Sequence, residues 1–305
     1  MIYYEIVKRK REVFIMSGLL YAVITAVIFA TFEPASKIIA ADFSPFAICG
    51  IRFLIGGIMF LPYSLYEIRK KNVSFTVTDH IKMVGLGILF ICFSMTMLQY
   101  SVKLSSSPAL IAIIFSANSL ITIVISVFVL KECFTLKKII ALLVCVIGFT
   151  LCSWESLIAK GELAAILLVV LSAFIFSTYT ILNKKMMQKA SGNILIGFSF
   201  VYGSILLLIA NWIFGGNIIS SDTVSTKSII MIIYIGVVVT GLGYWTYFGA
   251  LKHSATMASL SYLIKPALSP FVAVILNGVP ISCSMIIGLI LVIAGSYIVS
   301  YADNK

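Results

Sequence analysis

The segment PALIAIIFSANSLITIVISVFVL, residues 108–130, is apolar over almost its whole length and contains no Asp, Glu, Lys, Arg or His. An α-helix needs roughly 20 residues to cross the hydrocarbon core of a membrane, which is about 30 Å thick. Every backbone N–H and C=O inside lipid must find a partner, and a helix satisfies all of them internally. This segment therefore predicts a membrane-spanning helix.

The whole chain has the character of this segment. Hydrophobic residues make up 61% of its 305 positions and charged residues 11%, and the mean hydropathy is +1.13. Soluble domains carry about 25% charged residues, so this chain has too little polar surface to cover a globule in water. The net charge of +11 comes from short segments between apolar runs, which is typical of membrane loops and argues against nucleic-acid binding.

Apolar segments of spanning length recur along the chain, separated by short polar connections. They predict an all-α integral membrane protein of ten transmembrane helices, with spans at 14–39, 45–66, 81–100, 108–130, 137–153, 162–183, 194–214, 229–250, 255–276 and 281–301. With the N-terminus inside, the loops on the outer side hold only Lys103, Lys160 and Lys227. The positive-inside rule thus predicts a multi-pass protein of the cytoplasmic membrane with both termini in the cytoplasm.

The two halves of the chain match at a nearly constant offset. An offset of 147 positions pairs Lys37 with Lys184 and Gly50 with Gly197. Five spans is an odd number, so the second half enters the membrane from the opposite side to the first. The pattern predicts a five-plus-five inverted-topology repeat, an arrangement typical of secondary transporters.

Three local patterns accompany this layout. The first is the segment from Phe29 to Lys37, followed by Ser44-Pro45 and Arg52-Phe53. The second is Lys103–Ala109, which has a counterpart at Lys252–Ala258. The third is Leu263–Pro270. With these patterns the chain resembles the drug/metabolite transporter superfamily, in the form that has two EamA-type domains.

The resemblance implies a first EamA-like repeat at 14–153 and a second at 162–301. It implies a secondary active transporter that works by alternating access and exports amino acids or related metabolites. Family members commonly carry an acidic residue after the fourth and ninth spans. Glu132 fits the first place, whereas Pro280-Ile281-Ser282 occupies the second.

Ionisable residues inside spans are the strongest candidates for function, because a charge there costs at least about 2.5–3.5 kcal/mol without a partner or a cavity. The candidates are Glu33, Lys37, Arg52 and Lys265. Lys37 lies four residues after Glu33 and shares its helical face. Two interpretations stay open: a local ion pair that neutralises both, or a site for proton coupling or for a cationic group.

Lys265 lies near the middle of its span. It is either a partner for a substrate carboxylate or phosphate and part of the coupling, or one half of a fixed ion pair with Glu33. Arg52 is either a substrate ligand or a structural residue that snorkels outward or caps a neighbouring helix. Pro34 and Pro266 are predicted gating positions, because broken helices beside charges are typical of transporter sites.

Further side chains inside the spans could line the substrate path. They are Gln99, Asn118, Tyr179, Tyr244, Trp245, Tyr247 and Tyr262.

Motifs of enzymes are absent from the sequence: there is no Walker loop, HExxH or GxSxG, and the cysteines and histidines show no metal-ligand spacing. No catalytic residue, metal or cofactor is predicted. The expected partners are a small-molecule substrate, the lipid bilayer and protons as the coupling ion, in a monomer or homodimer. Two alternatives stay open, an anion or metabolite exchanger resembling the sugar-phosphate translocators and, more remotely, an intramembrane enzyme.

Overall fold

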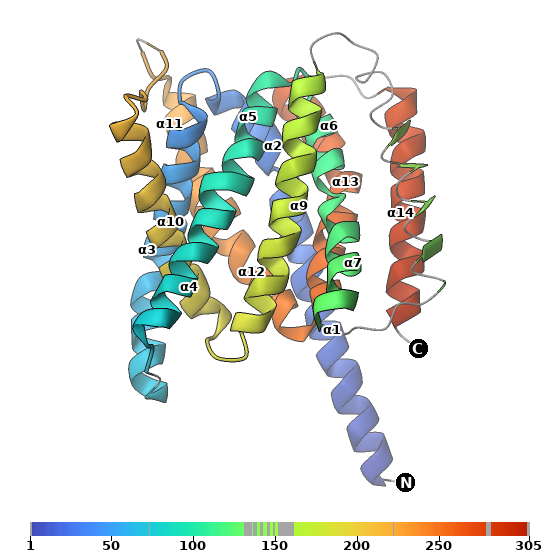
Figure 1. Ribbon diagram of the computed structural model, residues 1–305. Coiled ribbons are helices and arrows are strands. Elements are labelled where there is room, and N and C mark those ends of the chain that lie inside the picture. Colours follow the sequence, from blue (N-terminus) through green and yellow to red (C-terminus); the bar gives the residue numbers. More distant parts are fainter. Residues whose placement is uncertain are drawn as a thin grey trace.

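The computed structural model describes residues 2–72, 74–130, 162–221, 223–278 and 282–303, with scattered positions between 131 and 161. All regular elements in this part of the chain are helices (Figure 1). In the first half they are α1 (Ile2–Ala30), α2 (Phe32–Ile39), α3 (Pro45–Lys71), α4 (Val77–Gly87), η1 (Ile88–Met95), α5 (Thr96–Leu104), α6 (Pro108–Phe115) and α7 (Asn118–Leu130). In the second half they are α9 (Leu163–Met186), α10 (Gly192–Ile213), α11 (Thr226–Tyr234), η2 (Ile235–Leu242), α12 (Gly243–His253), α13 (Ala255–Asn277) and α14 (Cys283–Asp303).

Seven helical stretches in the described residues are long and apolar enough to cross a membrane, or eight if the bent α13 counts as one. Four of them match the first four predicted spans, which begin with 14–39 and end with 108–130. The other four match the sixth to ninth predicted spans, which begin with 162–183 and end with 255–276. The last predicted span falls on α14, whose apolar part is Cys283–Gly295. The predicted span at 137–153 lies largely outside the described residues, as does Glu132.

The outward faces of the helices are apolar, as lipid requires. On α9, Leu167 and Phe174 are 61% and 54% exposed, while Val169 and Phe176 are buried in the bundle. In water this pattern would expose a large apolar surface, so it fits a protein whose solvent is the bilayer. The interior of the bundle holds the polar and charged side chains discussed below.

Three predicted spans are interrupted in the middle. The first breaks at Thr31 between α1 and α2, next to Pro34, which has no N–H to continue the helical ladder. The fourth breaks between α6 and α7, where the side chains of Ser119 and Asn118 donate to the carbonyls of Ser116 and Phe115. The ninth bends by 46° between Ala255–Pro266 and Leu268–Asn277.

Two π-helical segments lie in the middle of the third and eighth spans. They are η1 in the stretch from α4 to α5 and η2 in the stretch from α11 to α12, and they begin 147 positions apart. Such segments shift the helical register locally and are frequent at functional sites.

Candidate functional site

An ion pair joins two of the broken helices at the centre of the bundle. Lys265 on α13 donates a hydrogen bond from Nζ to Oε1 of Glu33 in the first turn of α2. Both side chains are fully or almost fully buried. Of the two partners considered for Glu33, the observed one is Lys265. The second carboxylate oxygen, Oε2, has no hydrogen-bond partner among the described residues.

Arg52 lies beside this pair. Its guanidinium carbon is 4.2 Å from the centre of the Phe32 ring and 4.4 Å from that of Phe53, and the residue is only 1% exposed. It is near enough to both Glu33 and Lys265 for their charges to interact. The expectation that Arg52 snorkels outward is therefore wrong. Among the described residues, its Nε and Nη2 have no hydrogen-bond partner.

Aromatic rings enclose the three charged groups. Lys265 Nζ lies 5.4 Å from the ring centre of Phe115 and 5.6 Å from that of Tyr262, within range of cation–π attraction. Tyr244 and Tyr262 both pack on Phe29, with ring centres 5.0 and 5.5 Å away. The site thus combines charge with a mostly apolar wall.

The space left between these side chains is small, about 10 Å³. Arg52, Lys265, Tyr244 and Tyr262 all line it. Room of this size suits about one water molecule. A larger ligand requires the aromatic side chains or the broken helices to move.

Lys37 lies apart from this site. Its Nζ donates to the carbonyls of Val102, Lys103 and Ser105 at the end of α5. A local pair between Glu33 and Lys37 is therefore wrong, because the lysine is used to cap another helix. Pro34 also makes a contact with the second half, since its carbonyl accepts a hydrogen bond of 3.1 Å from Asn277 Nδ2.

The other predicted polar residues are buried around the centre. Gln99 accepts a hydrogen bond from Ser36 on α2, and its Nε2 has no partner among the described residues. Asn118 caps the break after α6. Tyr179 stacks on Phe90 with ring centres 4.1 Å apart, and Tyr247 shares a hydrogen bond of 2.8 Å with Thr180.

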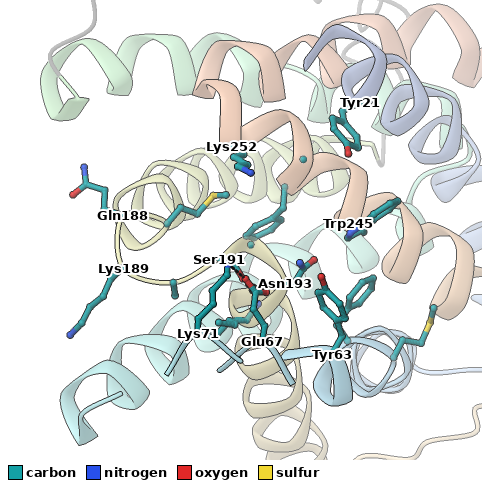
Figure 2. Close-up of a pocket in the computed structure, with 18 residues that line it drawn as sticks. Tyr21, Tyr63, Glu67, Lys71, Gln188, Lys189, Ser191, Asn193, Trp245 and Lys252 are labelled. Atoms are coloured by element: carbon teal, nitrogen blue, oxygen red, sulfur yellow. Dashed lines mark hydrogen bonds and ion pairs between the residues drawn. The ribbon is translucent and has the colours of Figure 1, made fainter. Parts of the chain in front are cut away.

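Trp245 does not join the central group. It is 43% exposed and lines a separate cleft of about 920 Å³ between α3 and α12, near the end of the bundle where both helices finish. Figure 2 shows Tyr21, Tyr63 and Trp245 along this cleft, with Glu67 and Lys71 beside Ser191 and Asn193. Glu67 accepts hydrogen bonds from Lys71 and Ser191, and Lys252 completes the basic rim.

Two loop residues that the sequence interpretation missed hold the ends of helices. Asp42 accepts from Ser225 N at 3.0 Å and Lys189 donates to Asp79 at 2.7 Å. Hydrogen bonds from Ser228 and Ser225 hold the pKa of Asp42 below its ordinary value. The sequence holds a signal that could have identified these two residues. Asp42 and Lys189 are 147 positions apart, so they occupy corresponding places in the two halves of the chain.

Comparisons with known proteins bear on these observations. The profile of the EamA-like transporter family matches the chain twice, at residues 16–154 and 163–301. A Clostridium kluyveri protein named an uncharacterized transporter is 32% identical over 94% of both chains. A Salmonella typhimurium protein named a probable amino-acid metabolite efflux pump is 23% identical, over 83% of this chain and 85% of that protein. A crystal structure with 17% identity shares the fold with a TM-score of 0.73, over 95% of this chain and 99% of that one.

Proposed function

This chain belongs to the EamA-like transporter family, within the drug/metabolite transporter superfamily, and from this premise we propose that it is a secondary active transporter that exports amino acids or related zwitterionic metabolites. As a multi-pass membrane protein of this family it acts on small molecules in a lipid environment. The name of the Salmonella relative supports both amino acids and export.

The proposal rests on buried polar atoms at the centre of the bundle that have no hydrogen-bond partner among the described residues. Arg52 Nε and Nη2 are donors without a partner, and Glu33 Oε2 is an acceptor without one, among the described residues. Guanidinium groups bind carboxylates through paired hydrogen bonds. A molecule with a carboxylate for Arg52 and an ammonium for Glu33 would satisfy both, and an α-amino acid carries these two groups.

The local charge and the walls narrow the substrate class further. Arg52 and Lys265 carry two positive charges against one negative charge on Glu33, so the site favours a ligand that brings a carboxylate. Phe29, Phe115 and the neighbouring tyrosines offer apolar surface to the rest of the molecule. We therefore expect amino acids with apolar or aromatic side chains to be preferred.

The central pair is also the candidate for coupling. A substrate ammonium that binds Glu33 competes with Lys265, and release of Lys265 from its partner favours loss of its proton. In this scheme Glu33 and Lys265 take part in both binding and coupling, while Pro34 and Pro266 place the breaks that allow the helices to move. Gln99, Asn118, Tyr179, Tyr244 and Tyr262 line the path, and Trp245 belongs to its outer approach.

Two equivalent halves give this transporter its alternating access. Lys37 and Lys184 hold corresponding helix ends, and η1 and η2 occupy corresponding places. We propose ten spans in an inverted repeat with units 14–153 and 162–301. The cleft beside Trp245 then opens on the lysine-rich cytoplasmic side, where both termini lie.

Transport by purified protein in proteoliposomes tests the proposal. Uptake of labelled L-phenylalanine should be competed by unlabelled L-leucine, but only weakly by phenethylamine or 3-phenylpropionate, which each lack one of the two charged groups. An ionophore that collapses the proton gradient should abolish net uphill flux. Equal competition by 3-phenylpropionate would show that the ammonium group is not recognised.

An anion exchanger is the second candidate, favoured by the excess of positive charge at the centre. It predicts a flux that depends strictly on a counter-substrate and is insensitive to the ionophore. The same proteoliposomes, loaded with or without unlabelled substrate, separate the two mechanisms.

A further inference from the structure

Asp42 ties the start of one helix to the start of another. It lies just before α3, and its Oδ2 accepts a hydrogen bond of 3.0 Å from the backbone N–H of Ser225, the residue that caps α11. Ser220 N–H donates to the carbonyl of Asp42 at 2.8 Å, and Phe43 forms an antiparallel β-bridge with Ile219. We call these contacts the Asp42 clasp.

Lys189 makes the matching connection at the other end of the bundle. It lies just before α10, and its Nζ donates to both carboxylate oxygens of Asp79, at 2.8 and 2.7 Å. Asp79 in turn accepts from the N–H of Thr76, the residue that caps α4. We call these contacts the Lys189 clasp.

Each clasp therefore begins a pair of helices that run in the same direction. From the Asp42 clasp, α3 runs beside α11 and η2. From the Lys189 clasp, α10 runs beside α4 and η1.

The helices of each pair meet again near their middle at glycines. A Cβ on Gly203 of α10 would lie 2.6–2.8 Å from backbone atoms of Gly87. A Cβ on Gly56 of α3 would lie 2.9 Å from the side chain of Thr240 in η2. Close approach of this kind makes a tight crossing point in each pair.

Beyond the crossing, the first pair separates. The cleft of about 920 Å³ lies between the ends of α3 and α12, where Lys71 and Lys252 line its rim (Figure 2). Lys189 lines the same cleft. The Lys189 clasp is thus formed on the face where the protein is open, and it does not close that face.

From this arrangement we propose that the two clasps are permanent pivots that stay formed throughout the transport cycle, and that access changes when the far ends of one helix pair part while those of the other pair close. Asp42, Lys189 and Asp79 are then positioning residues that hold the fixed end of each pair. The inference rests on the proposed alternating access, but it makes its own claim about which contacts never open.

A disulfide at the Asp42 clasp tests the pivot. Residues opposite each other in an antiparallel bridge have Cα atoms about 4.5–5.5 Å apart, within the range of a disulfide. Phe43→Cys with Ile219→Cys, in a background without the native cysteines, should form this bond on oxidation. Oxidised protein should keep L-phenylalanine flux within about two-fold of the reduced protein, because a pivot does not open.

The matched control joins the moving ends. Lys71→Cys with Lys252→Cys, linked by a short bis-maleimide across the cleft, should lower flux at least about ten-fold, because the cleft can no longer change width. If the disulfide at 43 and 219 stops transport as the cleft linker does, the Asp42 clasp is a gate and the proposal is overturned.

The Lys189 clasp is tested by charge. Lys189→Met should lower flux, Lys189→Arg, which keeps a cationic donor for Asp79, should keep it, and Lys185→Met, at the exposed end of α9, should have no effect. A loss of flux in Lys189→Arg equal to that in Lys189→Met, while both variants remain folded in gel filtration, would contradict a positioning role for this pair.

Spin labels separate this inference from the proposed function. With spin labels on unnatural amino acids at positions 71 and 252, which do not react with thiols, the distance distribution in nanodiscs should be the same whether the cysteines at 43 and 219 are oxidised or reduced, with and without L-phenylalanine. A distribution that changes with substrate in the reduced protein but not in the oxidised protein would refute the pivot. Absence of amino-acid flux in the wild type would count against the proposed function and not against the pivots.

Discussion

Lys37 and Lys184 make equivalent hydrogen bonds 147 positions apart. Lys37 Nζ donates to the carbonyls of Val102 and Lys103, and Lys184 Nζ donates to those of Leu251 and Lys252. Each ammonium group therefore lies at the C-terminal end of another helix, where the unpaired carbonyls and the helix dipole favour a cation.

The first prediction follows from this capping. Lys37→Met and Lys184→Met should each lower the free energy of unfolding by about 1.5–3 kcal/mol, the usual value of hydrogen bonds to a charged group. Thermal unfolding in detergent measures the change. Lys185→Met, next to Lys184, should leave the unfolding temperature unaltered, and an equal loss there would rule out the capping role.

The second prediction concerns the buried ion pair. In Lys265→Ala the Glu33 carboxylate stays buried, and Arg52 is the only cation left near it among the described residues. The loss of one partner of a buried ion pair costs about 3–5 kcal/mol in soluble proteins. Glu33→Ala with Lys265→Ala should recover much of that stability, as measured by thermal unfolding. If the pair acts in binding and coupling, the stable double variant should still show no transport. Near-normal flux from it would reduce the pair to a structural role.

The positions of the eight spans that the structure describes could be predicted from the sequence to within about five residues, because hydropathy and length determine most of each span. The helix from Pro108 to Leu130 is interrupted at residues 116 and 117, which hydropathy does not register. The pairing of Lys265 with Glu33 is one of the alternatives that the sequence predicts, since two isolated charges in lipid each need a partner.

Long-range contacts decide the points that the sequence interpretation missed. Lys37 was expected on the face of Glu33, but its partners are carbonyls that lie far along the chain and have no side-chain signature. Arg52 was placed in the correct span, yet its stacking between Phe32 and Phe53 depends on how α2 packs against α3. Trp245 was assigned to the central path because position within a span does not reveal which way a side chain points.

The third prediction tests the role of Arg52 as the carboxylate ligand. Arg52→Lys keeps a positive charge but loses the planar pair of donors, so flux of L-phenylalanine should fall while the protein stays folded. Arg52→Gln should abolish flux. Phenethylamine, which has no carboxylate, should inhibit wild type only at high concentration, and its inhibition constant should be the same for Arg52→Lys. A rise in that constant equal to the loss of flux would indicate general damage to the site.

The fourth prediction concerns pH and the Asp42 carboxylate. Its pKa is below the ordinary value of 3.8, first because of the hydrogen bond from Ser228 and then because of that from Ser225 N–H. A group with a lowered pKa stabilises the folded state above its unfolded pKa, and this contribution disappears as the pH falls through the folded pKa. The difference in unfolding temperature between wild type and Asp42→Asn should be constant from about pH 5 to pH 8 and should shrink below about pH 4. A difference that grows on acidification would contradict this assignment.

The last prediction concerns the tight crossing of α10 with α4. A methyl group added at Gly203 would lie 2.6–2.8 Å from the carbonyl and Cα atoms of Gly87, all of them backbone atoms that cannot rotate away. Gly203→Ala should therefore force the helices apart and lower the free energy of unfolding by about 1–3 kcal/mol, as overpacking does in other cores.

Gly85 is the matched control, because a Cβ there meets nothing within 4 Å. Gly85→Ala should stabilise the helix by up to about 1 kcal/mol, since alanine loses less backbone entropy than glycine. Thermal unfolding of the two variants compares the costs directly, and transport should fall only for Gly203→Ala. If both substitutions behave alike, the contact between Gly203 and Gly87 does not limit how closely these helices approach.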